Sequence, residues 1–428
     1  MGKELGGALI RRRSPVVAPS GTPRPRWPCH GAITHRRHGL LIAVLVCLLA
    51  AACTSPDSRK ATATSQGSAG PTPRDYWPTA GWRTAAPNDQ GMDPAVVGEL
   101  DAKVSGSYPQ VRSLLVVRHG YLVYERYWHG LDASDGHNSF SVTKSFVSAL
   151  VGIALGDGQL RGLDQTVEEL LADHLPANAD PRLRRVTLKQ LLTMTSGLAG
   201  DDSLVGGLDG ISDREAQSRD WVRHILGRRV VTAPGEQWAY SSDGSHLLSA
   251  IVADATGQST LDFARTELFA PLGIATDGAL EPKIHDWPPT QVELEAYEQA
   301  SVAWPRDPQG YHYGGGFLKL PARDLAKFGY LYLNGGRWEG AQVVPADYVA
   351  ASIRPQSDPS QGPGDYGYLW WLTNETGHDS FRALGYGGQL IQVIPDLDLV
   401  VVITSDATQG RDNAADLIGS VIVSAVNG

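Results

Sequence analysis

The main part of this sequence contains no cysteine. Only three of the 428 residues are cysteine, and Cys29, Cys47 and Cys53 all lie within the first 53 positions. Residues 54–428 therefore hold no disulfide, no thiol nucleophile and no cysteine metal ligand. The histidines are scattered and form no His-Glu-x-x-His pattern. A zinc hydrolase is therefore not indicated, and no metal or cofactor is implied.

Positive charge is scarce outside the N-terminal region. The formal net charge is −9, yet residues 1–53 carry Lys3 and seven arginines against Glu4 as their one acidic residue. The acidic excess thus lies in the remainder of the chain. An acidic body offers no basic surface for phosphates, so we expect no nucleic acid among its partners.

The most apolar run of the N-terminal region covers residues 40–52 and is too short to span a bilayer as a helix. It follows two arginines and ends in three alanines before Cys53, as in a bacterial lipoprotein signal. We therefore expect a leader over residues 1–53 and export to the cell envelope, with membrane attachment through a lipidated Cys53. Ordinary cleavage and secretion is the alternative. Residues 54–75 read as a flexible tether, and residues 76–428 as the folded domain.

Strand patterns occur at both ends of this domain and helix patterns in between. Residues 113–117 and 121–127 predict a β-hairpin, and 383–395 and 397–404 predict two further strands. Helical spacing covers residues 141–155, 187–193, 220–226, 244–254, 322–333 and 411–426. We expect an α+β fold: an antiparallel β-sheet flanked by helices, plus a mainly helical lobe, with the site in a cleft between them.

Ser141-Val142-Thr143-Lys144 is the sharpest chemical signal. A serine hydroxyl is a weak nucleophile until a neighbouring group takes its proton. Residues three apart share one face of a helix, so Lys144 can place its amine beside the Ser141 oxygen. The N-terminus of the helix adds N–H donors for a developing oxyanion. The alternative is a helix-capping Ser141 with a solvent-exposed Lys144.

Two further segments fit such a site. Tyr240 stands at a loop-to-helix junction, where a phenol can act as general base for Ser141 and then protonate the leaving group. The glycine-rich stretch 383–389 opens a strand whose backbone can approach a ligand and supply a second oxyanion N–H. Taken singly, Tyr240 also fits a packed aromatic residue, and the glycines fit a tight turn.

The combination resembles the serine β-lactamase and penicillin-binding-protein superfamily. The motifs, in order, are Ser141–Lys144 followed by serine, LLTMTSGL (191–198), PGEQWAYSS (234–242), GGGFLKLPARDLAKFG (314–329) and GYGGQLIQVIPDLDLVVV (385–402). The class C-like branch, with its esterases, D-amino-acid peptidases and 6-aminohexanoate-oligomer hydrolases, is most similar. The resemblance covers roughly residues 90–425 and implies the β-lactamase/transpeptidase-like fold expected above.

By position, the resemblance implies that Ser141 is the acylated nucleophile, with Lys144 and Tyr240 as its general base and acid. Ser242 stands where the family usually has asparagine. The third family element, usually Lys-Thr-Gly or His-x-Gly, is here a segment without lysine or histidine. Its candidate oxyanion and substrate-binding residues are Tyr386, Gly387, Gly388 and Gln389. A positive group there normally grips a substrate carboxylate, so its absence argues against efficient β-lactam or peptidoglycan recognition.

We therefore expect an exported serine hydrolase that cleaves an ester or amide bond in a small molecule or short peptide. A β-lactamase or D,D-carboxypeptidase is one alternative, and a non-catalytic binding module of the same fold is another. Weaker candidates are two acids that could meet a substrate amine, Asp201 and Asp202, and a set of aromatic residues that could line a pocket: Tyr311, Tyr313, Tyr368, Trp370 and Trp371. His246 is interpreted as structural.

Overall fold

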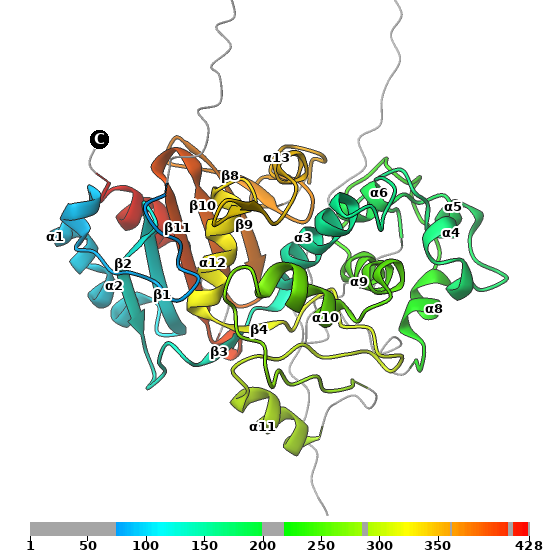
Figure 1. The fold of residues 1–428 in the computed structure, drawn as a ribbon, viewed down its shortest axis with the longest axis horizontal. Coiled ribbons are helices and arrows are strands. Elements are labelled where there is room, and N and C mark those ends of the chain that lie inside the picture. Colours follow the sequence, from blue (N-terminus) through cyan, green and yellow to red (C-terminus); the bar gives the residue numbers. More distant parts are fainter. Residues whose placement is uncertain (1–73, 199–217, 285–289, 360–361, 410–413, 427–428) are drawn as a thin grey trace, which may run out of the picture. The chain divides into compact units, whose positions relative to one another are not determined.

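The computed structural model describes residues 74–198, 218–284, 290–359, 362–409 and 414–426 (Figure 1). The expected leader, Cys53 and nearly all of the expected tether lie outside these residues, as do Asp201 and Asp202. Arg74 already contacts the folded domain, because its guanidinium forms an ion pair with Asp398 at 2.6 Å. Arg74, two residues before the expected start of the domain, is therefore already part of its contacts.

The main sheet of the described residues is antiparallel and is built from both ends of the domain. Its seven strands are β1 (Val111–Arg118), β2 (Tyr121–Tyr127), β7 (Asp365–Tyr366), β8 (Trp371–Glu375), β9 (His378–Gly385), β10 (Gln389–Ile394) and β11 (Leu399–Ser405). They lie in the order β2-β1-β11-β10-β9-β8-β7. The β1–β2 hairpin pairs with the last strand, with Leu115 opposite Val402. The predicted antiparallel sheet and its first hairpin are confirmed.

One predicted strand is in fact two. Residues 383–395 do not form a single strand, because β9 ends at Gly385 and β10 begins at Gln389. Gly387 and Gly388 have φ angles of 73° and 90°, a left-handed conformation that glycine adopts without steric cost. The glycines therefore reverse the chain and make a tight hairpin, which was the alternative interpretation of this stretch.

The central strands β1, β10 and β11 are buried on both faces, whereas β8 has no buried residue. On β1, Leu114 and Val116 point into one apolar cluster and Leu115 and Val117 into another, as the alternation of side chains along a strand requires. In Figure 1, helices α1 (Pro94–Gly98) and α2 (Leu100–Ser107) cover the first face together with the C-terminal segment. Of the predicted last helix, residues 411–413 lie outside the described residues, and the described remainder contains the π-helix Ile418–Val423 between turns.

The second face packs against α12 (Ala322–Leu333), beyond which lies the helical lobe (Figure 1). Further helices are α3 (Thr143–Gly156), α4 (Val167–Leu170), α5 (Pro181–Arg184), α6 (Leu188–Leu192), α8 (Trp221–Leu226), α9 (Ser242–Thr256), α10 (Thr260–Ala264), α11 (Gln291–Gln299) and α13 (Ala346–Ser352). Short strand pairs are β3 (Gly136–Asn138) with β4 (Lys319–Pro321), and β5 (Arg337–Trp338) with β6 (Ala341–Gln342). The predicted helices at 187–193, 220–226, 244–254 and 322–333 are confirmed.

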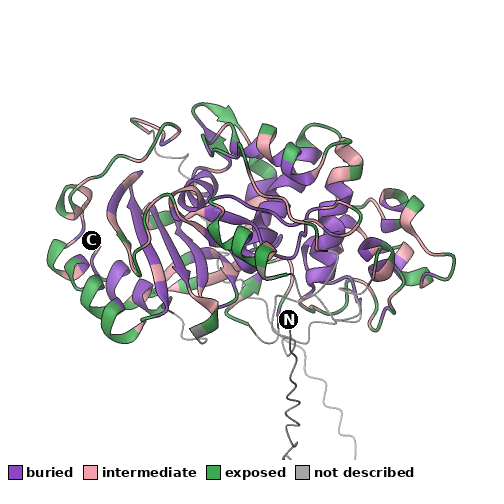
Figure 2. Ribbon diagram, turned by 90° about the horizontal axis from the view of Figure 1, so that it is seen from below, coloured by how far each residue is buried: buried purple, intermediate pink, exposed green. Residues whose placement is uncertain are grey.

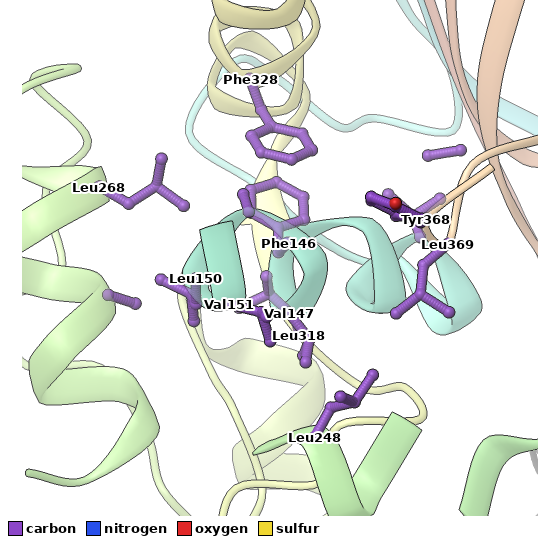
Figure 3. Close-up of a cluster of buried hydrophobic side chains, with 14 of the residues drawn as sticks. Phe146, Val147, Leu150, Val151, Leu248, Leu268, Leu318, Phe328, Tyr368 and Leu369 are labelled. Atoms are coloured by element: carbon purple, nitrogen blue, oxygen red, sulfur yellow. The ribbon is translucent and has the colours of Figure 1, made fainter. Parts of the chain in front are cut away.

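Helix α3 runs through the centre of the domain, and its residues from Thr143 to Ala154 are all buried (Figure 2). It packs against α9, and Phe146 stacks on Phe328 of α12 with ring centroids 3.7 Å apart (Figure 3). This helix joins the sheet-covering α12 to the helical lobe. A helix buried on every side is held by packing more than by its own propensity, so its start is fixed by its neighbours.

Phe146→Ala is expected to destabilise the domain by about 3–5 kcal/mol, because the ring is fully buried and its removal leaves a cavity between α3 and α12. Urea or guanidinium denaturation followed by circular dichroism measures this. Phe146→Leu is the matched control and is expected to cost about 1 kcal/mol. A loss below about 1 kcal/mol for the alanine variant would contradict the central packing role of this ring.

No helix in the described ranges is long and apolar enough to cross a membrane. The same residues contain no group of three or more histidine, cysteine, aspartate or glutamate side chains that could hold a metal ion.

Candidate active site

Ser141 lies in a 3-10 turn, Phe140–Val142, directly before α3. The backbone of Leu318 holds this turn in place. The Ser139 hydroxyl donates to the Leu318 carbonyl oxygen at 2.6 Å, and Thr143 Oγ1 accepts from the Leu318 amide at 3.0 Å. The predicted helix thus begins two residues later than expected, and Ser141 stands at its entrance, partly exposed.

Lys144 points inward, toward Ser141. Its side chain is buried with 1% exposure, and Nζ donates to Ser141 Oγ at 3.0 Å and to the Gly315 carbonyl oxygen at 2.5 Å. No carboxylate of the described residues lies within ion-pair distance of this Nζ. Ser141 makes no side-chain cap at the start of α3, whose N-cap is Val142. The alternative of a capping serine with an exposed lysine is therefore wrong.

Tyr240 completes the group from a distant part of the chain. Its ring centroid lies 4.8 Å from Lys144 Nζ. The segment that carries it is braced by Met194, whose carbonyl oxygen accepts from the Ala239 amide at 2.8 Å and whose sulfur accepts from the Ser241 amide at 3.1 Å. The structure therefore brings a hydroxyl, an amine and a phenol ring together at one point. Met194, which belongs to the motif at 191–198, holds the backbone on either side of Tyr240.

Ser242 is the first residue of α9 and is buried with 2% exposure. Ser241, not Ser242, caps this helix, since its Oγ accepts from the Gly244 amide at 3.0 Å. Ser242 faces the glycine that holds Lys144: a Cβ placed on Gly315 would lie 3.0 Å from Ser242 Cβ. Ser242 therefore borders the site beside the contact between Lys144 and Gly315. Its short side chain leaves room for the Gly315 backbone.

The β9–β10 turn borders the site from the sheet. A Cβ on Gly385 would lie only 2.3 Å from the Ser139 carbonyl oxygen, so the end of β9 approaches the turn before Ser141 as closely as a glycine permits. The Tyr386 ring, 41% exposed, lies 5.9 Å from the Phe140 ring between centroids. The turn thus stands next to Ser141, where its backbone N–H groups were expected.

The Gln389 side chain supports this turn from its buried side, where Nε2 donates to the Tyr386 carbonyl oxygen at 3.3 Å. It is buried with 2% exposure, donates from Nε2 to the Ser405 carbonyl oxygen at 2.8 Å and accepts from the Ser405 amide at 3.0 Å. These bonds tie β10 to the end of β11. Gln389 can therefore contribute to the site through its backbone, while its side chain holds the sheet together.

The observation that joins fold and site is Lys144 Nζ lying 3.0 Å from Ser141 Oγ at the junction of an antiparallel sheet and a helical lobe. Residues 100–421 match the family model described as Beta-lactamase. The chain belongs to the β-lactamase family. The β-lactamase/transpeptidase-like fold and the predicted family are both confirmed, and as a member this chain is a serine hydrolase.

Relatives within this family differ in what their names say they act on. The chain is 25% identical over 310 residues to a 6-aminohexanoate-dimer hydrolase of Paenarthrobacter ureafaciens, covering 68% of this chain and 71% of the relative. It is 31% identical over 203 residues to esterase EstB of Burkholderia gladioli, covering 42% of this chain and 51% of the esterase.

Solved structures share the fold at lower identity. A D-stereospecific amidohydrolase from Streptomyces sp. aligns with a TM-score of 0.57 and 18% identity over 77% of this chain and 98% of its own. A penicillin-binding-protein homologue from Pyrococcus abyssi aligns with a TM-score of 0.57 and 19% identity, covering 74% of each chain.

Unusual backbone conformations gather around this β-lactamase-family site. Of the described non-glycine residues with positive φ, the four buried ones are Phe140 (48°), Met194 (57°), Phe317 (68°) and Leu369 (60°). Phe140 precedes Ser141, Met194 braces the Tyr240 segment, and the Leu369 carbonyl oxygen accepts from Ser145 Oγ at 2.7 Å. Such conformations cost free energy for bulky residues and concentrate at functional sites. The sequence gives no signal for them, because they depend on surrounding contacts.

The five aromatic residues considered for a pocket do not gather at one place. Tyr313 and Trp370 are fully buried, and Tyr311 donates to Asp254 at 2.8 Å. Of these five residues, Trp371 alone is linked to Tyr240 by ring contacts, through Trp238. His246 is buried against Asp307 at 3.1 Å, in line with a structural role.

Proposed function

We propose that this β-lactamase-family enzyme cleaves an ester or amide bond through an acyl-enzyme on Ser141. The observation that carries the proposal is the 3.0 Å contact between Lys144 Nζ and Ser141 Oγ, together with the Tyr240 ring over the same Nζ. A nucleophile, a base in hydrogen-bond reach and a third group beside the base make up the minimal set for nucleophilic catalysis at a carbonyl.

The geometry suggests one proton path. Lys144 Nζ accepts the Ser141 proton while Oγ bonds to the substrate carbonyl carbon, and the Gly315 carbonyl oxygen keeps Nζ in position. The backbone amide of Ser141 and the amides of the β9–β10 turn stabilise the oxyanion. Tyr240 passes the proton to the leaving alcohol or amine. Water then attacks the acyl carbon, the bond from this carbon to Ser141 Oγ breaks, a water proton returns to Oγ, and the acid is released.

Tyr240→Phe is expected to lower kcat by about 10²–10³-fold, because it removes the phenol oxygen that transfers the proton but keeps the ring over Lys144. KM is expected to change little. Steady-state kinetics on an activated and a non-activated ester measure both constants, and the loss is expected to be larger for the poorer leaving group. An unchanged kcat on both esters would exclude Tyr240 from proton transfer.

The substrate preference is tested with purified residues 54–428, which keep the contact between Arg74 and Asp398. The panel holds short-chain p-nitrophenyl esters, linear amides, D-peptides and the β-lactam nitrocefin. We expect ester or linear amide turnover to exceed that of nitrocefin, because the turn at Tyr386 has no lysine or histidine. Nitrocefin turnover that rivals ester turnover would support the β-lactamase alternative. No turnover and no fluorophosphonate label on Ser141 would support a binding module.

Export and anchoring remain proposals carried by the sequence. Residues 1–53 would act as the leader, residues 54–75 as the tether and Cys53 as the lipid acceptor, which places the hydrolase domain in the bacterial cell envelope. Labelling with a radioactive fatty acid in the native host tests this for the full chain. We expect label on the wild type and none on Cys53→Ala. An unlabelled wild type found in the medium would favour secretion.

A further inference from the structure

Three aromatic rings contact one another around Phe140, the residue before Ser141. Phe140 immediately precedes the nucleophile, and its ring lies 5.9 Å from Tyr386 and 6.5 Å from Phe317 between centroids. The three residues come from the turn before α3, the segment after the glycine run and the β9–β10 turn. Three distant stretches of chain thus place rings at one edge of the site, here called the aromatic surface.

Two of these rings are held in costly backbone conformations. Phe140 has a φ of 48° and Phe317 a φ of 68°, in the region that bulky side chains rarely occupy. The Phe140 turn is fixed by hydrogen bonds, since its amide donates to Asn138 Oδ1 at 3.0 Å and its carbonyl oxygen accepts from Thr143 Oγ1 at 2.6 Å. The surrounding structure therefore maintains the position of these rings against the local backbone preference.

The third ring is the accessible one. Phe140 and Phe317 are buried, with exposures of 8% and 6%, whereas Tyr386 is 41% exposed. The buried rings thus form a rigid backing, and Tyr386 presents a ring to solvent next to the nucleophile. An accessible aromatic ring with a fixed apolar backing favours apolar and aromatic groups, which bind by area burial and ring stacking. It supplies no positive charge to a substrate carboxylate.

We propose that Tyr386 determines specificity by binding an uncharged aryl group of the substrate next to the scissile ester or amide bond. The inference rests on the proposed function and narrows its substrate class to neutral aryl esters and amides. A ring in this position also selects against substrates with a carboxylate near the scissile bond, because their charge would lose hydration without gaining a partner.

The test compares four variants of Tyr386 in two substrate series. One series varies the acyl group of p-nitrophenyl esters: acetyl, phenylacetyl and hydrogen glutaryl. The other varies the alcohol of acetate esters: ethyl and benzyl, followed with a pH indicator. We expect Tyr386→Ala to lower the aryl-over-acetyl or benzyl-over-ethyl preference in kcat/KM by about tenfold in at least one series. Tyr386→Phe is expected to keep it and Tyr386→Leu to keep part of it.

Tyr386→Lys gives the reciprocal result: the hydrogen glutaryl ester is expected to gain relative to the phenylacetyl ester. Tyr124→Ala serves as the control for loss of a ring, because Tyr124 lies on β2 against the other face of the sheet. This control should leave both preferences unchanged, and melting temperatures verify that all variants fold.

The possible failures are distinguishable. If Tyr386→Ala turns over the esters with unchanged aryl-over-acetyl and benzyl-over-ethyl preferences, the aryl-binding role is overturned. The serine hydrolase mechanism is unaffected by that result. Absence of turnover on every ester, with no fluorophosphonate label on Ser141, overturns the proposed function and the inference with it.

Discussion

Ser141→Ala is expected to lower kcat/KM by four or more orders of magnitude, about the loss seen when a serine hydrolase loses its nucleophile. The reason is that the acyl-enzyme needs a covalent bond to this oxygen, and no other described hydroxyl is recorded in hydrogen-bond contact with Lys144 Nζ. Steady-state hydrolysis of the best ester of the panel, together with intact-protein mass after fluorophosphonate treatment, measures the loss.

The matched control for this variant is Ser145→Ala. Ser145 is also a serine at the start of α3, but its hydroxyl donates to the Leu369 carbonyl oxygen at 2.7 Å and is buried away from Lys144. It is expected to keep the fluorophosphonate label, with a cost mainly in stability. A Ser141→Ala protein that still forms a covalent adduct would show that another residue is the nucleophile.

Lys144→Met is expected to lower kcat by about 10³–10⁴-fold, because general base catalysis by a positioned group contributes on that order. Methionine fills a similar volume, so we expect the fold to tolerate the substitution. The Ser141 label by fluorophosphonate is expected to form far more slowly, since the hydroxyl has lost the group that takes its proton. Stopped-flow labelling and steady-state kinetics measure both effects.

Lys327→Met tests whether the loss is specific. Lys327 lies on α12 and is another buried lysine, with 5% exposure. Its Nζ donates to the Gly273 carbonyl oxygen at 2.8 Å. This substitution is expected to change stability and to leave kcat within about threefold of the wild type, because packing changes away from the active site act mainly on folding. Partial rescue of Lys144→Ala by added small amines would further identify the missing group as a base. Equal losses in both lysine variants would reduce Lys144 to a packing role.

Local patterns were enough for the elements that form independently of distant contacts. The β1–β2 hairpin follows from alternating apolar runs around His119-Gly120, and α12 from helical spacing bounded by a proline. The prediction of a single strand over residues 383–395 was wrong, because apolar spacing does not distinguish one strand from two strands joined by a turn. The deciding signal was the pair Gly387-Gly388, whose left-handed backbone reverses the chain.

The candidate site divides in the same way. The sequence by itself predicted the pair of Ser141 and Lys144, because residues three apart lie on one face of a helical turn. The tertiary structure decided what surrounds them. Tyr240 reaches Lys144 because Met194 braces its segment. The Gln389 side chain binds the Ser405 backbone, and the Phe140 ring contacts both Phe317 and Tyr386. Such long-range contacts depend on how helices and strands pack, and packing sums many weak interactions between residues far apart in the chain, which no local pattern encodes.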